Sequence, residues 1–249
     1  SSAASDVYKR QLLNNDLTDG GLEGLNAASV LPSPQMGWHK RKKSHHFDFL
    51  RPLIEEISEI IGIDPWHLIC DSFVSEEKCL EKENCRIQLA SDVDVFLARL
   101  AQRYASLGID REPVAYIKNN RGTYGLGIMT VTSGEELLNL SNRKMKKLMY
   151  GKGTSDTEDF LIQEGVPTLM KTQSGAPVEP VVYLVDGDAS SWFYRINPKK
   201  DEIGNLNSPS ARFVTSEEDR SYMTHAHNWH ALLSELSMLA MGLEYAALR

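Results

Sequence analysis

Residues 113–131 read PVAYIKNNRGTYGLGIMTV and combine two short apolar runs with a lysine and a glycine-rich turn. The first run, 114–117, is typical of a buried strand and ends at Lys118, and the second run, 128–131, follows the glycines. A lysine supplies a fixed positive charge, and glycines allow backbone N–H groups to close onto phosphate oxygens. The stretch therefore predicts a nucleotide triphosphate site, and a plain β-hairpin with a glycine-rich turn is the alternative.

The spacing of these glycines matches neither of two well-known phosphate-binding motifs. The P-loop pattern GxxxxGK[ST] is absent from the chain. The pattern at residues 122–127 is GxxGxG, which differs from the dinucleotide fingerprint GxGxxG and is not expected to open a helix. The turn indicates phosphate binding only in combination with the rest of the chain.

The composition of the 249-residue chain is that of an ordinary soluble globular protein, with 41% hydrophobic and 24% charged residues. This length suffices for one large domain or two modest ones. A formal net charge of −7 argues against general nucleic-acid binding. No apolar run has the length of a transmembrane helix, and no signal-peptide pattern is seen. Three cysteines, an odd count, suit a reducing cytoplasm, so these features favour a cytoplasmic protein.

Apolar residues recur at spacings of three and four in three stretches, which predicts amphipathic helices over residues 47–61, 91–107 and 228–247. In the last of these, Leu239 and Leu243 are among the residues expected to face inward. Each stretch has a residue typical of a helix terminus, because Ser and Asn cap starts and glycine accepts the left-handed conformation after an end. These residues are Gly62, Ser91, Gly108 and Asn228.

Extended segments are expected in the remaining apolar runs. A strand is predicted near residues 67–74, and another over residues 160–164. The runs 180–185 and 191–196 lie on either side of the Asp-Gly-Asp turn at 186–188, which is a strong hairpin signal. Strands and helices together predict an α+β fold of mostly antiparallel sheets with flanking helices.

A cationic stretch stands out in this otherwise acidic chain, residues 37–46 with the sequence GWHKRKKSHH. The usual meaning of a charge run is a solvated face. Because this run includes Trp38, it is also a candidate for binding phosphates or a substrate carboxylate, with arginine preferred for bidentate contact. Arg41 and Lys42 are its predicted substrate-binding residues.

These motifs resemble the proteobacterial glutamate–cysteine ligase family, whose members have an ATP-grasp-like fold. The resemblance is carried by residues 113–131 and by the later motifs LIQEGVPT, EPVVYLVDG, FYRINP and GNLNSP, and it runs from about residue 11 to the end. It implies an α+β, ATP-grasp-like fold in which the nucleotide lies between two β-rich layers. It also implies ATP and magnesium as cofactors.

The resemblance also suggests a division of the chain. Residues 1–10, SSAASDVYKR, show no periodicity and are interpreted as a non-native leader. We expect residues 11–110 to form a substrate-side and linking region, and residues 111–249 to form the nucleotide-binding and catalytic region. Since members of the family carry a substantial N-terminal portion that is not seen here, the chain is expected to be a truncated member.

Transferred onto this sequence, the resemblance assigns several residues to ATP. Lys118 would contact a phosphate and act in catalysis, and the glycine-rich turn would close over the nucleotide as a lid. Gln163 and Glu164 would read the adenine and ribose edges, and a solvent-facing strand end is the alternative for this pair. The expected lid residues are Gly122, Thr123, Tyr124, Gly125 and Gly127.

Glu179, Asn205 and Asn207 would bind magnesium, which prefers oxygen ligands. Many ATP-grasp enzymes use Glu-x-Asn late in the chain, whereas this chain has Asn-Leu-Asn. The alternative for the two asparagines is an Asx turn. Arg195 would neutralise charge at the transferred phosphoryl group, although a salt bridge to Glu179 would equally explain an arginine in a core strand.

The implied reaction has two steps. The γ-carboxylate of glutamate attacks the terminal phosphoryl group of ATP, and the amine of cysteine then displaces phosphate from γ-glutamyl phosphate, as in the first step of glutathione biosynthesis. Asn14, Asn15 and Asp16 would lie at the amino-acid site, and a strand running into an Asx turn is the alternative. Another ATP-grasp carboxylate–amine ligase and an inactive nucleotide-binding fragment are the alternative functions.

Overall fold

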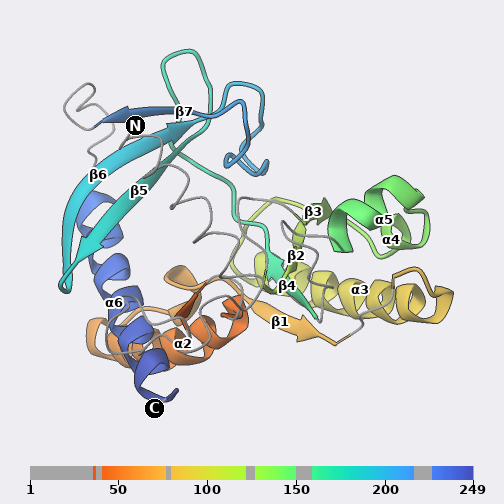
Figure 1. The fold of residues 1–249 in the computed structure, drawn as a ribbon, viewed down its shortest axis with the longest axis horizontal. Coiled ribbons are helices and arrows are strands. Elements are labelled where there is room, and N and C mark those ends of the chain that lie inside the picture. The colour runs from red at the N-terminus through yellow and green to blue at the C-terminus, as the bar shows by residue number, and fades with distance from the viewer. Residues whose placement is uncertain are drawn as a thin grey trace, which may run out of the picture.

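The structure, a computed structural model, describes residues 36–37, 41–76, 80–121, 127–149, 159–215 and 226–248. Within these ranges the chain forms two antiparallel sheets, one of four strands and one of three, with helices beside each (Figure 1). The prediction of a mixed fold with antiparallel sheets and flanking helices is confirmed.

The four-stranded sheet contains the stretch with the lysine and the glycines. Its strands are β1 (Ser72–Ser75), β2 (Ala115–Asn119), β3 (Ile128–Val131) and β4 (Phe160–Glu164), in the spatial order β1-β4-β2-β3. All three pairings are antiparallel, and β2 lies between β3 and β4. The strands predicted on either side of the glycine-rich turn, and the one predicted over residues 160–164, are therefore confirmed.

The strand predicted near residues 67–74 is only partly correct. Pro65–His67 instead form a 3₁₀ turn, η3, whose preceding residue Asp64 accepts a hydrogen bond from the backbone N–H of Trp66 at 2.9 Å. Strand β1 then begins at Ser72. The side-chain bond of Asp64 and the fixed φ of Pro65 favour a turn at this point over an extended chain.

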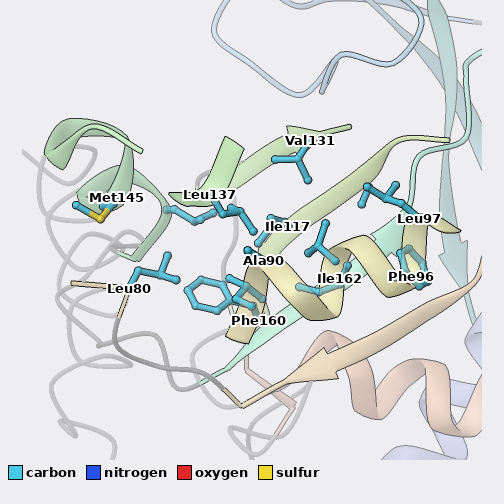
Figure 2. Close-up of a cluster of buried hydrophobic side chains, with 14 of the residues drawn as sticks. Leu80, Ala90, Phe96, Leu97, Ile117, Val131, Leu137, Met145, Phe160 and Ile162 are labelled. Atoms are coloured by element: carbon cyan, nitrogen blue, oxygen red, sulfur yellow. The ribbon is translucent and has the colours of Figure 1, made fainter. Parts of the chain in front are cut away.

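The largest hydrophobic core lies between the four-stranded sheet and three helices, α3 (Glu83–Ser106), α4 (Glu135–Leu138) and α5 (Asn142–Met149). Figure 2 shows the side chains of the sheet meeting those of the helices in this core. Its members from the sheet include Ala115, Ile117, Val131, Phe160 and Ile162, and those from the helices include Leu89, Val93, Phe96, Leu100, Leu137, Met145 and Leu148.

Two helices end where their glycines predicted. Helix α2 (Lys43–Ile61) is followed by Gly62 with a φ of 71°, and α3 is followed shortly by Gly108 with a φ of 67°. Both values lie in the left-handed region, which costs glycine little because it has no Cβ. None of the helices in the described ranges is long and apolar enough to cross a membrane.

All three predicted helices begin earlier than expected, and α2 begins at Lys43 rather than at residue 47. Helix α3 begins at Glu83, so Ser91 lies inside it, and α6 (Ala226–Ala246) begins before Asn228. In α3 the apolar face extends toward the N-terminus through the buried Leu89, which stabilises the additional turns by burial. A polar residue within a helix resembles a cap when only the sequence is considered.

The three-stranded sheet is formed by β5 (Val178–Val185), β6 (Asp188–Ile196) and β7 (Arg212–Thr215), and the predicted hairpin is confirmed as β5–β6. Its turn places Asp186 at a φ of 53° and Gly187 at a φ of 98°. Positive φ at both central residues is what the common two-residue hairpin turn requires. A small second core on this sheet includes Val178, Tyr194 and Ile196.

Helix α6 packs against α2 and against β5 and β6, as Figure 1 shows. The prediction that Leu239 and Leu243 face inward is wrong, because they are 52% and 42% exposed. Ala240 and Glu244 are the buried residues of this part of the helix. The inward face is therefore partly polar, since Glu244 pairs with Arg41 beside α2.

The sheet with β2 crosses the boundary that the sequence predicted near residue 110. Its strand β1 and its covering helix α3 precede this position, whereas β2, β3 and β4 follow it. The division into residues 11–110 and 111–249 stays a prediction.

A buried carboxylate connects this sheet with its surroundings. Glu164 at the end of β4 is 2% exposed, and its carboxylate accepts hydrogen bonds from Trp66 Nε1 at 2.8 Å, the Tyr104 hydroxyl at 2.8 Å and the Asp71 backbone N–H at 3.1 Å. Burial, together with the bond to Glu164, raises the pKa of Tyr104. Three donors compensate a charge that would otherwise be costly to bury.

The substitution Glu164→Gln should lower the free energy of unfolding by about 1–3 kcal/mol, because the amide keeps one acceptor oxygen and places an NH₂ group against the remaining donors. Urea denaturation would measure this change. The control Glu59→Gln, on an exposed part of α2, should change stability by less than about 0.5 kcal/mol. Equal effects of the two substitutions would contradict the structural role of Glu164.

A second stability prediction concerns Gly134, where a Cβ atom would lie 2.2 Å from the Ala90 carbonyl oxygen and 2.7 Å from Asp94 Oδ2. Gly134→Ala should therefore cost about 1–3 kcal/mol. The matched control is Gly242→Ala in α6, where nothing lies within 4 Å of the added atom. It should stabilise the helix by about 0.5–1 kcal/mol. Thermal unfolding of both variants would show shifts of opposite sign.

Candidate functional site

Lys118 lies on the face of the four-stranded sheet that is turned away from α3. Alternation along β2 buries Ala115 and Ile117 in the core and places Tyr116 and Lys118 on the opposite face. Gln163 on β4 is paired in register with Tyr116, so it is a diagonal neighbour of Lys118. The Lys118 ammonium donates a hydrogen bond to Gln163 Oε1 and lies 5.0 Å from the centre of the Tyr116 ring.

A cavity of about 480 Å³ opens on this face. Four cationic side chains line it, and the described residues of its lining include no carboxylate. Its other walls are largely apolar and come from α2, the β5–β6 hairpin and α6. The cations are Arg41, Lys42, Lys43 and Lys118, and the apolar residues are Phe47, Leu184, Met238 and Met241.

Lys43 is brought to this cavity by a clamp between the start of α2 and the end of β2. Its backbone N–H donates to the Asn120 carbonyl at 2.9 Å, and its ammonium donates to the Asn119 carbonyl at 2.7 Å. The Ser44 N–H and hydroxyl contact the side-chain amide of Asn120, each at 2.9 Å, and Asn120 is fully buried. Burial, followed by the nearby charge of Lys118, lowers the pKa of Lys43 to about 8.

Arg41 is oriented by the last helix. Its Nε lies 2.9 Å from the Glu244 carboxylate and its Nη2 lies 2.7 Å from the same group, which is 5% exposed. Arg41 Nη2 also lies 3.0 Å from His46 Nδ1, and His46 Nε2 lies 2.9 Å from the Ser237 hydroxyl. Burial, together with the positive charge of Arg41, lowers the pKa of His46, so a neutral ring that accepts from Arg41 fits this network.

Lys118 also lines a second, smaller pocket of about 210 Å³. This pocket contains Glu179 at the start of the β5–β6 hairpin and Asn205 after it, together with Tyr116 and Thr168. Lys118 therefore lines both spaces, one lined by cations and one that includes a carboxylate.

The predicted magnesium ligands are only partly brought together. Glu179 and Asn205 line the smaller pocket, whereas Asn207 is not among its lining residues. Arg195 Nη1 donates to Glu179 Oε1 across the hairpin, as the salt-bridge alternative expected. Asn205 Oδ1 accepts from the Asn207 N–H at 3.1 Å, as the Asx-turn alternative expected. Within the described ranges, no three His, Cys, Asp or Glu side chains are grouped to hold a metal ion.

The structure separates the two residues that were expected to read the nucleotide. Gln163 shares the face of Lys118, whereas the Glu164 carboxylate is on the opposite face with its three donors. Adjacent residues of a strand point to opposite faces, so the pair cannot line one cavity through both side chains. Of the predicted substrate residues, Arg41 lines the large cavity, and so does Lys42, which forms an ion pair with Asp159 at 2.8 Å.

Gly127 is the one residue of the expected lid that lies within the described ranges. It has a φ of 63°, with its would-be Cβ 3.1 Å from the Leu148 carbonyl oxygen. Glycine is therefore required at this position on two grounds, its backbone conformation and its close approach to α5. The predicted site residues outside the described ranges are Asn14, Asn15, Asp16, Gly122, Thr123, Tyr124 and Gly125.

Sequence reasoning missed Lys43, His46 and Glu244 as parts of this site. Lys43 and His46 belong to the cationic run noted in the sequence. The run indicated a possible binding surface but gave no way to choose among its residues. Glu244 gave no such signal, because it reaches Arg41 from 203 positions away in the chain.

Comparisons with known proteins bear directly on this site. The family model described as glutamate-cysteine ligase, GshA, matches residues 5–242. A crystal structure from Methylobacillus flagellatus KT, of a candidate gamma-glutamylcysteine synthetase, superposes with a TM-score of 0.74 at 28% identity and covers 86% of this chain. The present chain spans 53% of that protein. No curated protein sequence matched. Since the family model extends over nearly the whole sequence, the chain belongs to the glutamate-cysteine ligase family.

Proposed function

We propose that this chain catalyses, or forms the catalytic part of a protein that catalyses, the ATP- and magnesium-dependent ligation of L-glutamate to L-cysteine through γ-glutamyl phosphate. The proposal includes an ATP-grasp-like arrangement, in which the nucleotide lies between the two sheets. The observation that carries it is the cavity lined by Arg41, Lys42, Lys43 and Lys118, in a member of the glutamate-cysteine ligase family.

The charge of the large cavity suits the phosphates of ATP. Lys43 and Lys118 are half-buried cations, and burial lowers the pKa of both. The charge of Lys118 lowers the pKa of Lys43 further, and a polyanion beside the two would relieve that repulsion. The volume of about 480 Å³ lies within the roughly 300–1,000 Å³ typical of ligand sites. An amino acid suits this space less well, because the lining offers its ammonium group no carboxylate.

The smaller pocket offers few protein ligands, and magnesium needs few. Magnesium is usually held by one or two carboxylates together with phosphate oxygens and water. Glu179 supplies one carboxylate, and Asn205 supplies an amide oxygen beside it. When bound there, the ion would offset charge on the phosphates, with Arg195 holding the Glu179 carboxylate in place. Asn207 would contribute through the turn that it forms with Asn205.

In the proposed reaction, the residues of this chain act by positioning and by charge. Lys118 lines both pockets, and its ammonium would contact a phosphate in the larger one or the glutamyl carboxylate in the smaller one. A cation at this point would reduce repulsion between the attacking carboxylate and the phosphoryl group. Arg41 and Lys42 would bind the more distant phosphates.

One observation favours the alternative of an inactive nucleotide-binding fragment. The chain spans 53% of the Methylobacillus flagellatus protein, so a residue needed for the amino acids can lie outside it. Such a fragment would bind Mg-ATP without releasing ADP when glutamate is added. Another carboxylate–amine ligase would release ADP with a different pair of amino acids, and substrate competition would identify it.

The central test is ADP release by the purified chain with Mg-ATP, first with glutamate and then with glutamate and cysteine. We expect release to require the amino acids and γ-glutamylcysteine to be detected by mass spectrometry. Lys118→Met should lower the rate by roughly 10²- to 10³-fold, as for the loss of other groups that stabilise transition-state charge. The control Lys144→Met, on an exposed position of α5, should retain the rate. Full activity of Lys118→Met would refute the assigned site.

ATP affinity should also depend on pH through Lys43. Because the pKa of this amine is lowered to about 8, it carries its charge below that pH and loses it above. Calorimetry should therefore show ATP binding weakening as pH rises from 7 to 9. Lys43→Met should weaken binding roughly 10-fold at pH 7 and flatten this dependence. The control Lys171→Met, at an exposed ion pair, should keep the wild-type profile. An unchanged pH profile in Lys43→Met would contradict the assignment.

A further inference from the structure

The amide of Gln163 connects two groups that lie on the same face of the sheet. Its Oε1 accepts from the Lys118 ammonium, and its Nε2 donates to Cys70 Sγ. Cys70 lies just before β1, in which Ser72 is paired with Gln163 in register. The half-buried thiol, amide and ammonium thus form a short chain of hydrogen bonds across three neighbouring segments.

The ammonium determines which end of the amide faces it, and the thiol lies where it accepts from the other end. A lysine ammonium has only donors, so it requires the carbonyl oxygen of an amide. With Oε1 toward Lys118, Nε2 is directed at the sulfur. The reversed amide would place its NH₂ group against the ammonium, which is repulsive.

The partner of Lys118 is a neutral group, and this distinguishes it from Arg41 and Lys42. Arg41 and Lys42 are each paired with a carboxylate, Glu244 and Asp159. In the part of the chain that the structure describes, no ion pair joins Lys118 to a carboxylate. An amide can hold an ammonium in place without cancelling its charge, so the charge stays available to an anion.

We propose that Gln163 is a positioning residue, which holds the Lys118 ammonium in place while leaving its charge uncompensated, and that Cys70 supports the Gln163 amide by accepting from its Nε2. This inference rests on the proposed function of Lys118 and adds to it. Gln163 thus acts through Lys118.

Several charged and titratable groups around Lys118 influence its titration. Lys43 faces it from α2, the Cys70 thiol from the segment before β1, and Glu179 from the smaller pocket. The Tyr116 ring covers it from the same strand. A change at Gln163 leaves Lys43, Glu179 and Tyr116 in place, but it removes the hydrogen bond to the Cys70 thiol. The Cys70 variants therefore measure the contribution of the thiol to the titration of Lys118.

The test measures the titration of the Lys118 amine by pulse labelling with an acylating reagent, without substrates, followed by peptide mass spectrometry. Gln163→Glu adds an anion and should move the labelling midpoint of Lys118 upward by about one pH unit. Gln163→Leu removes the acceptor and should move it downward. Lys171, in its exposed ion pair with Glu202, serves as the internal reference in the same digest.

Activity measurements then distinguish the positioning of the Lys118 ammonium from the effect of its charge. Gln163→Glu should raise KM for ATP because the carboxylate cancels the charge of Lys118, whereas Gln163→Leu should mainly lower kcat because the ammonium is no longer held. Cys70→Val should shift the labelling in the direction of Gln163→Leu, and Cys70→Ser, which keeps an acceptor, should stay close to wild type.

An unchanged labelling midpoint of Lys118 in both Gln163 variants would overturn the proposal, as would a shift in the same direction in both. Urea denaturation of each variant excludes unfolding as the cause of a shift. The labelling needs no turnover, so opposite shifts in a chain that releases no ADP would retain the hydrogen-bond role and refute the proposed function alone. ADP release with unchanged labelling would refute only the role of Gln163.

Discussion

The alternation of side chains along β2 is the constraint on which the rest of this structure depends. Ile117 is fully buried between the sheet and α3, and this burial obliges Lys118 to project from the opposite face. A shift of the register by one residue would place the ammonium in the apolar core and expose the isoleucine. The apolar core on one side therefore fixes the position of the cation on the other, and the site inherits the rigidity of the sheet.

Around this fixed lysine, the cations of the large cavity fall into two classes. Lys118 and Lys43 are held by neutral oxygens, from the Gln163 amide and from the carbonyl of Asn119. Arg41 and Lys42 are held by carboxylates. The second class is partly neutralised by its carboxylates, whereas the contacts of Lys118 and Lys43 named here are to neutral oxygens. In the proposed reaction this gradient would direct the most negative part of the ligand toward Lys118.

The sequence predicts the elements of this fold better than their assembly. The strands around Lys118 and the β5–β6 hairpin were correct because each has a local signal, an apolar run beside glycines or an Asp-Gly turn. Helix starts were less accurate, since Ser91 caps a helix as plausibly as it lies within one. The three donors of Glu164 could not be predicted, because they come from distant segments and nothing adjacent to Glu164 in sequence indicates them.

The difference between local signals and long-range contacts also explains which residues of the candidate site the sequence indicated. Lys118 and Arg41 belong to short stretches that are unusual by themselves, a lysine before glycines and a cationic run in an acidic chain. The clamp between Ser44 and Asn120 and the pairing of Arg41 with Glu244 join segments that have no local relation. These long-range contacts convert a charge run, which is usually only a solvated face, into one wall of a cavity. Tertiary contacts of this kind, rather than the motifs alone, give the cationic residues their place beside Lys118.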